Sequence, residues 1–155
     1  MGLGNFEEAL AELDQIKTAA RSHPDVLSAR WRVSAQAGCW EDCVKIARKM
    51  ARSFPDWPVA RVQLALSLYT LGRVRPAVAV LEKAIERLGE SPLLTISLAC
   101  CLGKLGKLDR ARHIVEQSVE QLPDAIGLDR FLAPKVFDFD LGALWREDEG
   151  EEPAD

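Results

Sequence analysis

The sequence predicts an all-α fold made of repeated helix pairs, and two observations lead to this prediction. Four glycines are spaced 34 residues apart, and each is followed five residues later by a small residue: Gly4 and Ala9, Gly38 and Cys43, Gly72 and Ala77, Gly106 and Ala111. Hydrophobic residues make up 48% of the chain but aromatic residues only 6%, which favours interdigitating helices over sheets. Such repetition is typical of a solenoid, because each helix pair buries its apolar face only against its neighbours.

The first expected helix runs from Phe6 to about Ser22, with Asn5 as its cap. Apolar residues recur on one of its faces, which has no preceding helix to cover it: Phe6, Leu10, Leu13 and Ile16. The first repeat therefore lacks its first helix and begins with its second. We expect either that the chain is a piece of a longer array, or that another copy or another protein covers this face.

The remaining helices are predicted between punctuating residues. Gly38 and Gly72 end two of them, the two prolines Pro55 and Pro58 cannot share one helix, and Ser91 caps the helix that Pro92 opens. The expected ranges are 26–37, 42–53, 59–71, 74–88, 92–105 and 107–122.

These features resemble the tetratricopeptide repeat (TPR), a helix-turn-helix unit, over residues 1–123. The resemblance rests on the four glycine pairs and on residues at repeat-specific positions: Leu64-Ala65, Leu98-Ala99, Pro55 and Pro123. It implies a right-handed superhelical solenoid of antiparallel helix pairs, about three and a half units long, with a C-terminal capping segment. Pro24 and Pro92 come three residues later than the pattern, so the helices before them are expected to be about one turn longer. Trp31 occupies a small-residue position, so we expect it to displace its neighbour or to be exposed.

Three parts are expected along the chain. Residues 1–133 form the solenoid, with residues 124–133 as a capping helix; residues 134–147 are an apolar segment packing on it; residues 148–155 are a disordered acidic tail.

Charge and hydropathy exclude several functions. The chain carries a formal charge of -4, but residues 147–155 hold six acids and no base, so residues 1–146 carry +2. A nearly neutral body is not expected to bind nucleic acid, which needs clustered Lys and Arg. The apolar run 93–102 is too short to span a membrane, and no secretion signal opens the chain. We expect a cytoplasmic protein.

No residue pattern predicts catalysis, a cofactor or a metal site. The four cysteines, Cys39, Cys43, Cys100 and Cys101, lack the paired spacing of zinc sites and are expected to be small buried residues. His23 and His113 have no nucleophile and acid nearby in sequence, and each glycine is isolated rather than part of a phosphate-binding loop. A metal or redox protein built on the cysteines remains an alternative that a thiol titration would test.

What remains is a surface. The TPR resemblance implies a concave groove formed by the first helix of each repeat, which receives peptide segments. The family positions correspond to these residues: Arg32, Gln36, Val62, Leu66, Tyr69, Leu93, Ile96 and Cys100. Only Arg32 could serve in a carboxylate clamp, so the groove is expected to favour apolar side chains. Alternatively, the protein's own chain covers these residues.

The predicted function is that of a non-enzymatic adaptor or scaffold that binds a protein or peptide. The alternative is a structural part of a longer array, whose ends pack on neighbouring domains or form a homodimer through the first helix. A further expectation concerns apolar residues after Pro134 that must find a face: Phe137, Phe139, Leu141, Leu144 and Trp145. They are expected to cap the last repeat or, more boldly, to occupy the groove and compete with outside ligands.

Overall fold

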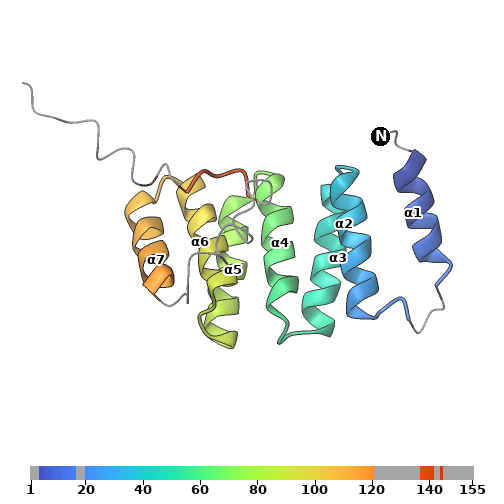
Figure 1. Cartoon of the computed structure of the whole chain (residues 1–155), viewed down its shortest axis with the longest axis horizontal. Helices are drawn as coiled ribbons and strands as arrows, with labels where there is room; N and C mark the ends of the chain where they lie inside the picture. Colours follow the sequence, from blue (N-terminus) through green and yellow to red (C-terminus); the bar gives the residue numbers. More distant parts are fainter. Residues whose placement is uncertain (1–3, 17–19, 121–136, 142–143, 145–155) are drawn as a thin grey trace, which may run out of the picture.

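The structure is a computed structural model that describes residues 4–16, 20–120, 137–141 and 144. This part of the chain contains seven helices and no strand: α1 (Gly4–Asp14), α2 (Pro24–Gln36), α3 (Trp40–Ser53), α4 (Pro58–Thr70), α5 (Val74–Leu88), α6 (Pro92–Lys104) and α7 (Leu108–Glu120). Figure 1 shows the helices standing side by side in chain order, from α1 at one end to α7 at the other.

Each helix contacts the next one in sequence, and α4 also contacts α6. The first helices of successive repeats therefore stack on one another, while the second helices cover their other side. This arrangement confirms the predicted all-α helical solenoid.

The turns inside the repeats are built alike. Gly72 has a φ of 79°, which lets the Arg73 amide donate to the Leu68 carbonyl oxygen at 2.8 Å and the Gly72 amide donate to the Tyr69 carbonyl oxygen at 3.0 Å. This is the Schellman ending of a helix, which uses glycine because L side chains disfavour a positive φ. The corresponding turns at Gly38 and Gly106 repeat the same pair of bonds. The 34-residue spacing of Gly38, Gly72 and Gly106 is thus a spacing of helix ends.

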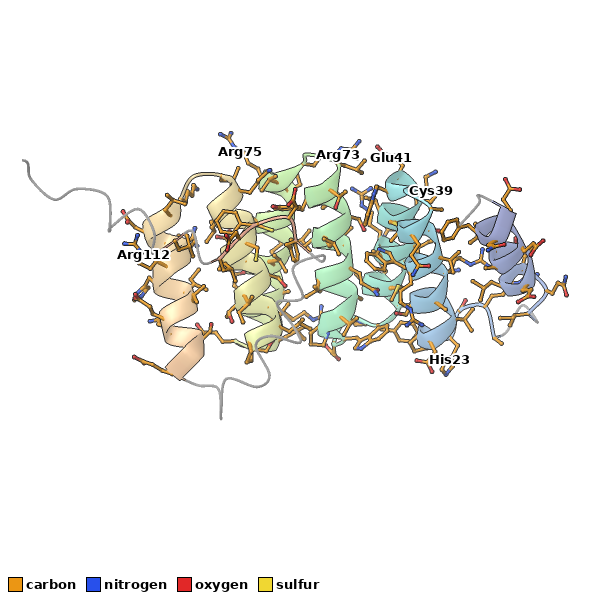
Figure 2. The ribbon with its side chains drawn as sticks, turned by 45° about the horizontal axis from the view of Figure 1, so that its top comes forward. His23, Cys39, Glu41, Arg73, Arg75 and Arg112 are labelled. Carbon is orange, nitrogen blue, oxygen red and sulfur yellow. The ribbon has the colours of Figure 1, made fainter. Side chains whose placement is uncertain are left out.

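Successive turns are also joined to each other at one edge of the solenoid. Arg73 Nη2 lies 2.7 Å from Glu41 Oε1, and Figure 2 shows both side chains at the same edge. The pair is half-exposed, so it contributes little to stability.

The small residues after the turns lie where two helices cross. Cys43, Ala77 and Ala111 have 0% of their surface exposed, so each is completely buried. Met50 and Leu81 are among the largest side chains that are fully buried in the core.

We expect Ala77→Leu to lower the free energy of unfolding by about 1–3 kcal/mol, because the crossing leaves no room for a larger side chain. Urea unfolding measures this change. Ala9→Leu is the control: Ala9 is half-buried on α1 and should tolerate the substitution. An Ala77→Leu chain as stable as the wild type would show that the repeat register is wrong.

The predicted end of the first helix and the predicted extra turn of α5 are wrong, although α5 does end at Leu88 as expected. The first helix ends at Asp14 rather than near Ser22. There the Arg21 guanidinium donates to the carbonyl oxygens of Asp14 and Ile16, so free carbonyls at the helix end are satisfied without another turn. In the third repeat α5 has 15 residues and α3 has 14, so α5 is not a full turn longer. Gly89, with a φ of 84°, ends it first.

Trp31 is neither exposed nor unpartnered. It is 7% exposed, its indole N–H donates to Ser67 Oγ at 2.9 Å, and its ring meets Trp40 edge to face at 6.2 Å. The large Trp31 side chain is therefore buried between α2 and α4, where Ser67 accepts a hydrogen bond from its indole N–H.

The predicted capping helix 124–133 and the acidic tail 148–155 lie outside the described residues. No helix in the described part of the chain is both long enough and apolar enough to cross a membrane.

Candidate functional site

One face of α4 and α6 carries matching rows of residues, and we call it the groove face. Val62, Leu66 and Tyr69 follow each other at helical spacing on α4, and Ile96, Cys100 and Gly103 hold the equivalent positions 34 residues later on α6. All six are buried. The third of these positions differs most, because a tyrosine on α4 corresponds to a glycine on α6.

Phe137 packs on the α4 side of this face. Its ring meets the Tyr69 ring edge to face, with 5.2 Å between the ring centroids, and Phe137 is itself buried. Beside it, the Tyr69 hydroxyl donates to the Asp138 carbonyl oxygen at 2.9 Å. Burial, followed by the nearby Cys100, Cys101 and Asp138, raises the pKa of Tyr69 to about 12. The phenol therefore keeps its proton and remains a donor to this peptide carbonyl.

Phe139 packs on the α6 side, at Gly103. A Cβ atom built on Gly103 would overlap the Phe139 ring. Gly103 is the α6 residue equivalent to Tyr69, and the Phe139 ring occupies the space that a side chain at Gly103 would fill. Residues 137 and 139 are two apart in a non-helical stretch, so their rings meet equivalent positions of two successive repeats.

Leu144 extends the contact to the last repeat. It is 1% exposed, and its carbonyl oxygen accepts from Arg112 Nε at 2.9 Å and from Arg112 Nη2 at 2.5 Å. Arg112 projects from α7, as Figure 2 shows. Leu141 packs on the same core, whereas Trp145 lies outside the described residues. Figure 1 shows the described stretch 137–141 running beside α6 and α4.

The α2 end of the predicted groove differs from the α4–α6 part. Arg32 and Gln36 are exposed on α2, and Leu93 is half-buried at the start of α6. Gln63, on α4, donates from Nε2 to Ser28 Oγ at 3.2 Å, but its buried Oε1 accepts no hydrogen bond in the described part of the chain. This end of the groove is polar and carries an unused acceptor.

Sequence reasoning missed two residues that contact the C-terminal segment, Gly103 and Arg112, and a third, Lys104, that contacts Tyr69. Lys104 Nζ lies 5.9 Å from the centroid of the Tyr69 ring, on the side chain that binds Phe137. Gly103 could have been found from the repeat spacing, because it is the residue equivalent to Tyr69. No comparable signal marks Arg112, since its acceptor is a main-chain carbonyl.

The structure corrects one expectation about the cysteines: Cys39 is exposed, because it lies in the turn before α3, whereas Cys43, Cys100 and Cys101 are buried as expected. Burial raises the pKa of Cys43 to about 11 and the pKa values of Cys100 and Cys101 to about 12, so their thiols stay protonated at neutral pH. Among the described residues, no group of three or more Cys, His, Asp or Glu could hold a metal ion. Cys43 instead directs its sulfur to the Trp31 carbonyl oxygen at 3.6 Å.

We expect a thiol reagent at pH 8 to label one cysteine rapidly in the native chain and all four in denaturant. Cys39 is exposed, whereas the other three thiols are buried and have raised pKa values. Absorbance of the released thiolate counts the groups. A count well short of four in denaturant alone, which rises to four after treatment with a chelator or a reductant, would favour the metal or redox alternative.

No protein-family model and no curated protein sequence matches the chain. One solved structure that does match is YrrB, described as a TPR protein with an unusual peptide-binding site; it aligns with a TM-score of 0.62 and 19% identity, over 97% of this chain and 73% of the other. The chain has the TPR fold. At this identity the similarity to YrrB shows the TPR fold alone.

Proposed function

We propose that this TPR chain is a non-enzymatic interaction module that binds an apolar peptide or protein segment on the groove face, as an adaptor or scaffold. The observation that carries the proposal is the chain's own segment on that face. Two phenylalanine rings lie at equivalent positions of successive repeats, and a main-chain carbonyl accepts from Tyr69. Rings in pockets together with a main-chain hydrogen bond are a common mode of peptide recognition.

The polar α2 end of the groove could contact a ligand that extends beyond the surface covered by residues 137–141. Arg32 and Gln36 are exposed there, and Gln63 Oε1 is a buried acceptor without a donor. An unsatisfied buried acceptor costs about 1–3 kcal/mol, which a peptide N–H would recover. The ligand-binding surface therefore comprises the predicted groove residues together with Gln63 and Gly103. The peptide-binding site named for YrrB is consistent with this role.

The test uses the full chain carrying Phe137→Ser and Phe139→Ser, which removes the two rings from the groove face. A fluorescent peptide with the sequence of residues 135–145 should bind it with a Kd on the order of micromolar. Adding Leu93→Glu should weaken binding about tenfold, because a carboxylate beside apolar rings loses hydration. Leu93 is chosen because it is half-exposed, whereas Leu66 is buried and its replacement would disturb the fold.

The matched control is Ala79→Glu, which adds the same charge at an exposed position of α5. It should leave the affinity unchanged. Absence of saturable binding, or equal losses in the Leu93→Glu and Ala79→Glu chains, would refute the groove proposal.

A second candidate, assembly through α1, is favoured by the exposure of that helix. Four apolar side chains of this region remain partly exposed: Phe6, Leu10, Leu13 and Ile16. A homodimer or a neighbouring domain would cover them. Light scattering after size-exclusion chromatography decides between the two: a dimer that Leu10→Glu dissociates supports assembly through α1, and a stable monomer opposes the homodimer.

A further inference from the structure

A second pocket lies away from the groove face, between α3, α4 and α5. It has a volume of about 390 Å³, and four arginines line it: Arg48 and Arg52 of α3, Arg61 of α4 and Arg87 of α5. No acidic residue is among its lining residues. Four like charges thus converge on one concave site.

These arginines have few anionic partners. In the described part of the chain, Arg48, Arg52 and Arg61 form no ion pair, and Arg87 reaches only the exposed Asp56 at 3.5 Å. Arg61 Nε is buried, and none of the residues that the structure describes accepts a hydrogen bond from it. A buried N–H without a partner is unfavourable, and so is the mutual repulsion of neighbouring guanidinium groups. An oxyanion in the pocket would relieve both.

The next repeat shows that the fold itself does not need these arginines. Its equivalent pocket, between α5, α6 and α7, holds Glu82, Glu86 and Thr95 at the positions equivalent to Arg48, Arg52 and Arg61. The Thr95 hydroxyl is fully used, since it donates to the Ser91 carbonyl oxygen at 2.9 Å and accepts from Ser118 at 2.8 Å. The pocket between α3, α4 and α5 therefore has three arginines, one with an N–H unpaired in the described part of the chain, at positions where the equivalent pocket has two glutamates and a threonine whose hydroxyl is hydrogen-bonded.

We propose that the arginine pocket binds the carboxylates of an acidic peptide segment. Planar guanidinium groups recognise carboxylates through paired hydrogen bonds, and clusters of them read acidic motifs. The chain itself supplies a candidate occupant in residues 147–155, which contain six acids and no base. Whether from the same chain or from a second copy, this segment matches the pocket in charge.

The experiment measures fluorescence anisotropy of a labelled peptide with the sequence of residues 147–155 as full chain is added at low salt. Binding should weaken as salt rises, because the interaction is between charges. The Arg48→Glu, Arg52→Glu double variant copies the residues of the next repeat and should fold, and it should bind about tenfold or more weakly. The control, Arg75→Glu with Lys107→Glu, has the same net charge but alters exposed positions outside the pocket. It should bind as the wild type does.

A third chain, with the six acids of residues 147–155 changed to amides, identifies the source of the occupant. Binding that improves in this chain assigns the pocket to the acidic tail of this protein, and an improvement that does not depend on protein concentration assigns it to the tail of the same chain rather than of a second copy. Unchanged binding assigns the pocket to another acidic peptide. The proposal is overturned if neither the wild-type chain nor the amide variant binds the peptide. It is also overturned if the control loses as much affinity as the pocket variant. It is also overturned if a single-stranded oligonucleotide of equal charge displaces the peptide more effectively than unlabelled peptide does.

Discussion

Removal of residues 135–155 is expected to raise the affinity of the groove face for an apolar peptide by about tenfold or more. A tethered segment competes at an effective concentration on the order of millimolar, so an outside ligand must displace it before binding. Phe137 on Tyr69 and Phe139 at Gly103 occupy the surface that such a ligand would use. Titration of the truncated and full chains with the labelled peptide of residues 135–145 measures the difference.

Removal of residues 147–155 alone is the control, because it deletes the acidic tail and keeps both phenylalanines. It should leave the affinity for the apolar peptide unchanged. If the segment only caps the last repeat, the longer truncation will lower the melting temperature without any gain in affinity, and the competition account will be wrong.

The second large effect is expected at Trp31, where alanine should lower the free energy of unfolding by about 3–5 kcal/mol. The indole fills the α2–α4 interface and its N–H donates to the buried Ser67 hydroxyl. Such a loss is a large fraction of the ordinary stability of a domain, about 5–15 kcal/mol. Urea unfolding followed by fluorescence of the remaining tryptophans measures it.

Trp31→Phe separates packing from hydrogen bonding. It keeps most of the buried ring and removes the donor to Ser67, whose hydroxyl still donates to the Gln63 carbonyl oxygen at 2.7 Å. We expect this variant to lose about 0.5–1.5 kcal/mol from the missing bond. A loss below 1 kcal/mol for Trp31→Ala would show that the indole is not part of the core.

The repeat architecture could be predicted from the sequence because a few residue types determine it locally. A glycine at positive φ is needed to close each inner turn, and a small residue is needed where the helices cross, so the pairs Gly72 and Ala77 or Gly106 and Ala111 mark the repeat directly. The local sequence does not determine every helix end, because side chains from outside the helix can bind its terminal carbonyl groups. Arg21 satisfies the end of α1, and no local pattern indicates that contact.

The candidate sites depend on contacts between residues far apart in the sequence. The apolar character of Phe137 and Phe139 indicates that they pack against the solenoid. That Phe139 packs at Gly103 depends on how the C-terminal segment aligns with two successive repeats, which the sequence does not show. The arginine pocket was missed for a related reason. Net charge averages over the chain, whereas Arg48, Arg61 and Arg87 become neighbours only when three helices pack.

Nuclear Overhauser contacts between Tyr69 and Phe137 test whether the chain's own segment and an outside ligand share one surface. Their ring centroids are 5.2 Å apart, so cross-peaks between the two rings are expected in the isotope-labelled full chain. Saturation with unlabelled peptide of residues 135–145 should abolish these cross-peaks, as the peptide replaces the segment. Cross-peaks that persist while the peptide is bound would contradict the account.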